Sequence, residues 1–160
     1  MNLLKNLLLS LSLVAVASHA AAQTEIEDAW VRATVPGQAS SGAFMTLTAS
    51  TDSKLLSVQS PVAKVVQIHQ SSMKDDVMSM QQVDSVALPA GKPVTLDSNG
   101  YHIMLIDLAA QVKEGDHVPL TLIVEDAQGA KSAIKVDAIA RALNLPDHHA
   151  MPDHGTMKMN

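Results

Sequence analysis

The chain has 160 residues, a formal net charge of −5 and no cysteine. This length is enough for one domain with a buried core, and the acidic balance argues against a nucleic acid as partner. The lack of cysteine excludes disulfides, thiolate catalysis, a blue-copper centre and attachment of a lipid through cysteine. The chain is rich in methionine and histidine, with nine and seven residues, and has only one Trp, one Tyr and one Phe.

Residues 1–22 have the anatomy of a secretory signal peptide. Lys5 precedes an apolar run from Leu7 to Val16, and small residues follow. An uncleaved anchor is the alternative, but the run is short against the roughly 20 residues that a membrane-spanning helix needs. We expect cleavage after Ala20 or Ala22, and a mature form that is exported and not embedded in a membrane.

From residue 23 the pattern predicts β-structure, because short segments rich in Val, Ile, Leu and Thr alternate with turn residues. The expected strands are Ile26–Ala33, Gly42–Ala49, Lys54–Gln59, Val65–His69, Val77–Val83, Tyr101–Leu108, Val118–Val124 and Ala133–Ile139. Many short strands at regular spacing predict an all-β antiparallel sandwich or barrel. The stretch Ala138–Leu145 is the one place where a turn of helix is compatible with the sequence.

The end of the chain, PDHHAMPDHGTMKMN at residues 146–160, has two prolines, a glycine and no β-branched aliphatic residue. This composition predicts a flexible tail after a domain at 23–145. Three histidines and three methionines in the tail favour metal binding, since tracts of this kind bind metals. A solvated linker is the alternative.

Four side chains of the body suggest a metal site. His102 and Met104 lie two apart in GYHIMLIDL and share one face of an extended strand. His69 ends the segment VVQIH, and a turn at Lys74–Asp76 should fold Met78 and Met80 back beside that strand. Two ligands on each of two hairpin segments would make a four-coordinate site.

The ligand types select the metal. A thioether is a soft, neutral donor that suits Cu(I) and binds zinc, calcium or magnesium poorly, and imidazole suits copper in either oxidation state. A lone Met in a strand is more often core filler, and a lone His is more often a surface or hydrogen-bonded side chain. We favour those interpretations for Met45, Met78 and His117, and leave Met73 open because it lies at a hairpin turn.

The joint spacing of His69, Met80, His102 and Met104, H-x10-M-x21-H-x-M, resembles the signature of the periplasmic copper chaperones called PCu(A)C. The similarity covers about residues 26–136. The phrases that carry it, besides GYHIMLIDL, are AWVRAT at 29–34, GAFMTLT at 42–48, LPAGKPVTL at 88–96 and KEGDHVPLTLIVE at 113–125.

The resemblance implies a cupredoxin-like β-barrel or sandwich in the periplasm. It implies Cu(I) held at an exposed site by His69, Met80, His102 and Met104. It also implies delivery of copper to the binuclear copper site of cytochrome c oxidase, directly or through a Sco-type thiol protein. Many members carry a Met two residues after the first His; Ser71 stands there in this chain, and Met73 is the nearby candidate to replace that sulfur.

Some members of that family have a His/Met-rich C-terminal extension linked to Cu(II) or to a second copper, and this tail resembles it. The candidate tail ligands are His148, His149, Met151, His154, Met157 and Met159. The alternative function is copper storage or detoxification with the tail as the main binder. We expect no enzyme, since the sequence shows no Ser/His/Asp arrangement or paired carboxylates for proton transfer. A structural β-domain with incidental His and Met is the remaining alternative.

Overall fold

The computed structural model describes residues 23–142, which form ten strands and no helix within that range. The predicted signal peptide and the His/Met-rich tail lie outside the described residues. The strands are β1 (Thr24–Arg32), β2 (Ser40–Ala49), β3 (Ser53–Gln59), β4 (Ala63–Lys74), β5 (Val77–Val83), β6 (Val86–Leu88), β7 (Val94–Leu96), β8 (Tyr101–Leu108), β9 (His117–Asp126) and β10 (Lys131–Arg141).

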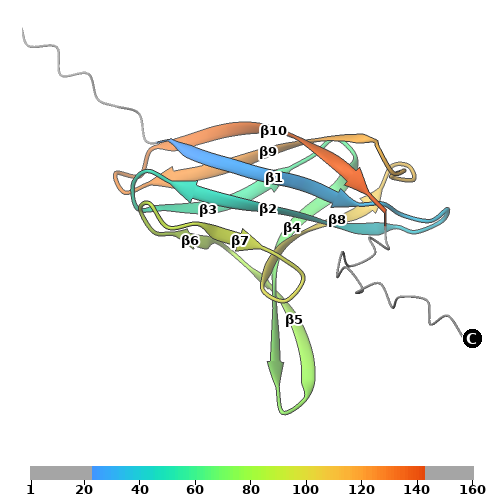
Figure 1. The fold of residues 1–160 in the computed structure, drawn as a ribbon. Coiled ribbons are helices and arrows are strands. Elements are labelled where there is room, and N and C mark those ends of the chain that lie inside the picture. The colour runs from blue at the N-terminus through green and yellow to red at the C-terminus, as the bar shows by residue number, and fades with distance from the viewer. Residues whose placement is uncertain (1–22, 143–160) are drawn as a thin grey trace, which may run out of the picture.

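All ten strands belong to one hydrogen-bonded sheet that curls around a core (Figure 1). Their order is β5-β4-β8-β2-β1-β10-β9-β3-β6, and β7 pairs with β2 off this path. Every pairing is antiparallel except that of β1 with β10, which is parallel. The predicted all-β sandwich is therefore confirmed for the described part of the chain.

The core is explained by the two-residue period of the strands, because successive side chains point to opposite faces. Ile103 and Leu105 of β8 are fully buried, as are Leu47 of β2, Leu55 of β3 and Leu122 of β9. These residues belong to one cluster that joins both halves of the sheet. The alternate positions of β8 therefore lie on the outer face, and this face carries His102 and Met104.

The hairpin of β4 and β5 projects from the sandwich, as Figure 1 shows. The last residue pair between β4 and β8 is Gln70 with Tyr101, so the end of β4 pairs with β5 alone. A two-residue turn closes the hairpin, with positive φ angles of 52° at Asp75 and 61° at Asp76. Two central residues with positive φ match the twist of a hairpin and fix its register.

The eight predicted strands are all present, with ends that differ by a few residues. The short strands β6 and β7 were not predicted, since three residues are too few to show a periodic pattern. A helical turn from Ala138 is wrong as far as Arg141. That segment is strand because its backbone pairs with β1, where Trp30 faces Ile139 and Arg32 faces Arg141.

Candidate metal centre

The four predicted ligands of the body lie on three neighbouring strands and on one face of the sheet. His69 of β4 is directly opposite His102 of β8, and Met104 is opposite Gln67, two residues earlier on β4. On the other side of β4, Met80 of β5 is opposite Ser71. Positions 67, 69 and 71 of β4 share a face, and directly opposed residues share it too. Strand pairing thus brings these four side chains, which are distant in sequence, to one outer face of the sheet.

The two imidazoles are close neighbours. Their ring centroids are 6.0 Å apart with an interplanar angle of 63°. The side chain of His102 is buried, with 3% of its surface exposed, whereas His69 is half-buried. The pair therefore forms the sheltered end of the site, and the thioether of Met80, on a residue that is 52% exposed, forms the open end.

Hydrogen bonds to both rings determine which nitrogen is free. Nε2 of His69 lies 2.8 Å from the side-chain oxygen of Gln67, and Nδ1 of His102 lies 3.2 Å from the carbonyl oxygen of Gly100. Because these oxygens only accept, each of those nitrogens carries the proton and donates. Nδ1 of His69 and Nε2 of His102 are then left with lone pairs. Nδ1 of His69 is buried and has no hydrogen-bond partner among the described atoms.

The environment also keeps His69 uncharged. Burial lowers the pKa of its imidazole below the usual value, and the neighbouring His102 lowers it further by charge repulsion. A neutral imidazole retains the lone pair that a metal ion needs. The surroundings of His69 therefore favour the neutral imidazole, which can donate a lone pair to a metal ion, over the protonated imidazolium.

Met80, His102 and Met104 line one open pocket with a volume of about 250 Å³. Its wall also includes Arg32 and Phe44. His69 is not part of the lining; it adjoins the pocket through its contact with His102. Three of the four predicted residues thus share a cavity, and the fourth lies beside it.

An aromatic wall, missed by the sequence reasoning, supports one side of the site. Trp30 and Phe44 have ring centroids 4.5 Å apart, and Phe44 lies 6.5 Å from the ring of His102. The guanidinium of Arg32 lies 5.5 Å from the centre of the Phe44 ring. Trp30 belongs to the phrase AWVRAT and Phe44 to GAFMTLT, and strand pairing is what brings Phe44 close to His102.

A glycine makes room for this wall. A Cβ on Gly42 would come within 2.8 Å of Cζ of Phe44. Gly42 is directly opposite Met104 in the pairing of β2 with β8. The bare backbone at this position lets the Phe44 ring lie flat beside the pocket and restrict His102 from that side.

Ser71 of β4 lies on the same face as the predicted ligands. Its side chain is buried, with 5% of the residue exposed, and its hydroxyl oxygen has no hydrogen-bond partner within the described region. It is directly opposite Met80 and two residues from His69 on the same face. An unpaired hydroxyl therefore lies between two proposed ligands.

The other candidates fall into three groups. Met45 is buried, as predicted, and His117 is on the surface, where its Nδ1 lies 2.7 Å from a carboxylate oxygen of Asp137. The interpretation of Met78 as core filler is wrong, since 57% of it is exposed. Tyr101, which precedes His102 in β8, packs against the core.

The donor set narrows the metals that could fit. No group of three or more His, Cys, Asp or Glu side chains suited to a metal occurs in residues 23–142. Two imidazoles and two thioethers form a soft, neutral set that fits a monovalent ion such as Cu(I) and disfavours Ca²⁺ or Mg²⁺. The tail residues His148, His149, Met151, His154, Met157 and Met159 lie outside the described range.

The family model described as "Putative lipoprotein LpqE-like" matches residues 24–136. The chain belongs to the LpqE-like family. A relative, "Putative lipoprotein Lxx21020" of Leifsonia xyli subsp. xyli, is 30% identical over 139 residues, which cover 81% of this LpqE-like chain and 84% of the relative. In the described part of this LpqE-like chain, no helix is long and apolar enough to cross a membrane.

Solved structures similar to this LpqE-like chain include copper-bound domains. The solution structure of CuI-DR1885 from Deinococcus radiodurans is 28% identical, with a TM-score of 0.56, over 79% of this chain and 85% of that one. The copper-bound PCuAC domain from PmoF2 has a TM-score of 0.59 at 24% identity, over 74% of this chain and 92% of that domain. The second likeness shows the fold alone. The predicted cupredoxin-like fold is confirmed.

Proposed function

We propose that this LpqE-like protein is an exported copper chaperone of the PCu(A)C type. It binds Cu(I) through His69, Met80, His102 and Met104. The observation that carries the proposal is the strand register, which aligns these four residues on one outer face. A copper(I)-bound relative of the same fold, at 28% identity, supports it.

The residues suit a carrier. The buried imidazole of His102 and the half-buried imidazole of His69 supply nitrogen donors, and the exposed thioether of Met80 leaves one side of the ion reachable by an acceptor. Thiolates are softer than thioethers and carry charge, so they bind Cu(I) more strongly. Transfer then proceeds by ligand exchange: each bond from copper to Met or His breaks as a bond to an acceptor thiolate forms. The oxidation state of copper does not change.

The proposed acceptor rests on the resemblance to PCu(A)C proteins, which implies the binuclear copper site of cytochrome c oxidase or a Sco-type thiol protein. Both are compatible with ligand exchange to thiolates outside the cytoplasm. The leader pattern at residues 1–22 supports export to the periplasm. The relative named as a lipoprotein supports export as well, although this chain has no cysteine to carry a lipid.

Competition titration tests the metal site. The full chain and the double variant Met80→Leu with Met104→Leu are titrated with Cu(I) in the presence of a Cu(I)-selective chelator. We expect one tightly bound ion in the parent and loss of this binding in the variant. Met45→Leu is the matched control, because it removes a thioether buried in the core at nearly constant volume. Unchanged affinity in the double variant would overturn the assignment.

The role of residues 146–160 is separated in the same assay. We expect the tail to bind Cu(II) through its imidazoles, and the body to retain Cu(I) after deletion of Pro146–Asn160. If most copper capacity is lost with the tail, and delivery to a thiol acceptor is unimpaired by the Met80 and Met104 changes, storage or detoxification replaces the carrier function.

A further inference from the structure

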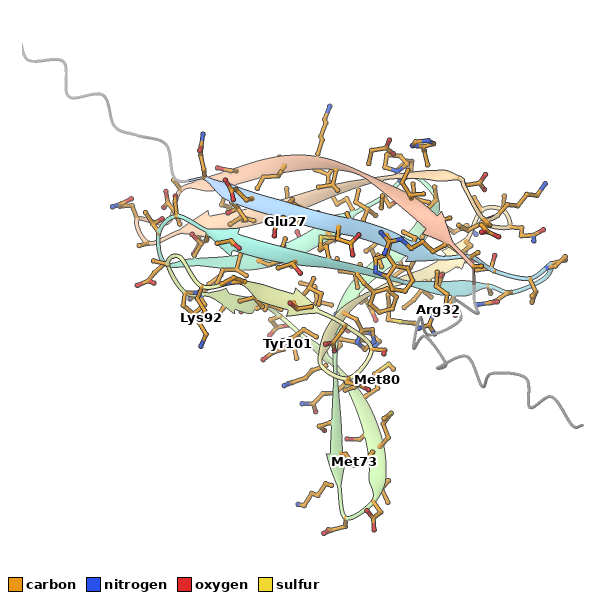
Figure 2. The ribbon with its side chains drawn as sticks, viewed as in Figure 1. Glu27, Arg32, Met73, Met80, Lys92 and Tyr101 are labelled. Carbon is orange, nitrogen blue, oxygen red and sulfur yellow. The ribbon has the colours of Figure 1, made fainter. Side chains whose placement is uncertain are left out.

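The projecting hairpin carries a second set of sulfur donors. Met73 of β4 is directly opposite Met78 of β5, and the next rung on the same face pairs Ser71 with Met80. The intervening rung, Ser72 with Ser79, faces the other side, where their hydroxyl oxygens are 3.0 Å apart. Figure 2 shows Met80 at the base of the hairpin and Met73 farther toward its tip.

Packing does not account for these thioethers. The exposed fractions are 65% for Met73 and 57% for Met78, against 2% for Met45 in the core. Strand β5 lies at the edge of the sheet and pairs only with β4. The exposed fractions of Met73 and Met78 show that this face of the hairpin is largely uncovered by the described residues. Two adjacent exposed methionines gain little from the hydrophobic effect, which favours their burial.

The geometry of the rung suits a soft ion. Directly opposed residues of antiparallel strands have Cβ atoms about 4.5–5.5 Å apart. The Met side chain has three rotatable bonds and a polarizable sulfur, so both sulfurs can reach one ion between them. The turn that closes the hairpin holds Met73 and Met78 in register, and it adds the carboxylates of Asp75 and Asp76 at the tip. Together with the adjacent Lys74, the two carboxylates give the tip one net negative charge, which attracts a cation.

The path from this rung to the histidines is continuous. Met80 lies two residues from Met78 on β5, and Ser71 lies between Met73 and His69 on β4. The buried hydroxyl of Ser71 has no partner in the described structure, which leaves an oxygen free at the junction. From the tip of the hairpin to the sandwich, the face therefore presents first the thioethers of Met73 and Met78. The thioether of Met80 and the hydroxyl of Ser71 come next, and the imidazole of His69 comes last.

We propose that Met73 and Met78 form a separate, weaker site for a soft monovalent cation, Cu(I), from which the ion passes along Met80 to the two histidines. The site binds without His69 or His102, so it does not depend on the proposed function for its existence. Only the passage along Met80 rests on that function.

The test uses Ag(I), a redox-inert soft cation, and the full chain labelled with ¹³C in the methionine methyl groups. NMR follows each methyl signal, assigned through the single variants Met73→Leu and Met78→Leu. We expect the Met73 and Met78 signals to move together, in a step that saturates at higher Ag(I) than the step of Met80 and Met104. The Met45 signal should stay fixed, as an internal control.

Two variants separate the sites. In Met73→Leu with Met78→Leu, one bound equivalent of Ag(I) should be lost, while the shifts of Met80 and Met104 persist. In His69→Ala with His102→Ala, the Met73 and Met78 step should remain. Val77→Leu changes an exposed side chain on the opposite face of the same hairpin and should alter neither step.

The outcomes distinguish the proposals. Static Met73 and Met78 signals, or signals that move only in one step with Met80, would overturn the second site and leave the proposed function intact. Movement of Met73 and Met78 without any response of Met104 would support the second site and contradict the proposed ligand set. The titration of the parent protein alone decides whether Met73 and Met78 respond in a separate step. Failure of a variant to fold does not affect that result.

Discussion

Met45 and Met80 show how differently the sandwich and the hairpin use one amino acid. Met45 lies on the inner face of β2 and is 2% exposed, as part of the core, whereas Met80 lies on an edge strand and is 52% exposed. Removal of Met45 from water stabilises the fold, by about 25 cal/mol per Å² of apolar surface. Met80 contributes little to stability through burial of apolar surface, and its sulfur remains accessible. Stability and the proposed binding therefore belong to different faces of the same sheet.

Strand β8 contains the same division within eight residues. Ile103 and Leu105 are fully buried in the core, and the intervening Met104 lies on the outer face beside the pocket. The two-residue period of a strand puts a core residue and a proposed ligand next to each other in sequence. Substitutions at neighbouring positions should thus have separable effects.

The largest effect is expected from Leu105→Ala. Removing a fully buried Leu side chain leaves a cavity and should lower the free energy of unfolding by about 2–5 kcal/mol. Met104→Leu, one residue away, should change it by less than about 1.5 kcal/mol, since the two side chains have similar volumes. Urea unfolding followed by circular dichroism measures both. Equal losses would contradict the separation of the two faces.

Gly42→Ala should have the next largest effect, because its Cβ would overlap the Phe44 ring at 2.8 Å. We expect a loss of about 1–3 kcal/mol in the free energy of unfolding. The displaced ring should also change the fluorescence of Trp30, whose ring centroid is 4.5 Å from that of Phe44. The control is Gly100→Ala, where the nearest atom to a Cβ is at 3.5 Å. An unaltered Trp spectrum would show that the wall tolerates the methyl group.

Gln67→Ala tests the binding face alone. This change removes the acceptor that holds the proton on Nε2 of His69. Loss of a partner of this kind lowers metal affinity about 10–100-fold. Cu(I) competition titration measures the affinity, and the free energy of unfolding should stay close to that of the parent. The matched control is Gln70→Ala on the opposite face of β4. Equal affinities for both variants would mean that Gln67 does not orient the ring.

The smallest effect is expected at Asp28, far from the core. A hydrogen bond from Arg141 is the main cause that lowers the pKa of Asp28. Burial opposes it, and the positive charge of Arg141 adds a further lowering. A lowered pKa in the folded state stabilises the fold above the unfolded pKa of about 3.9, and this contribution is lost as the pH falls through the folded value.

Asp28→Asn should therefore cost about 0.2–1 kcal/mol at pH 7, since the pair is largely exposed. The same change should cost nothing at pH 2. Asn tolerates the positive φ of 50° at this position, so the backbone is retained. Urea unfolding at the two pH values tests the sign, and a larger cost at pH 2 would reverse it.

The sequence was sufficient for most of the fold, because strand patterns and turn residues are local signals. Strand period predicted that His102 and Met104 share a face, and the hairpin turn predicted that Met78 and Met80 lie beside the strand of His69. The choice of Met80 as a ligand came from the family resemblance. The sequence could not show that His69 faces His102, because that register depends on the pairing of β4 with β8 across the whole sheet. The aromatic wall was missed for the same reason: Phe44 reaches His102 through the pairing of β2 with β8.

At Met78 a local pattern gave a wrong prediction of burial. A Met in an alternating strand suggests core, yet β5 extends past the sandwich and has no layer to pack against. The exposure of Met78 depends on how far β4 extends beyond its pairing with β8, and no local sequence pattern determines that length. The helical expectation at Ala138–Leu145 failed similarly, since a parallel neighbour decided the conformation up to Arg141.

The parallel pairing of β1 and β10 has a practical consequence for handling the molecule. Arg141 lies beside Arg32, at the pocket end of the sandwich, whereas Thr24 pairs with Ala49 at the far end. An affinity tag or surface linker joined before residue 23 would thus hold the protein with its pocket turned outward. The same attachment after residue 142 would start next to the pocket and obstruct an incoming acceptor. Immobilised transfer assays should accordingly be anchored through the amino-terminal side.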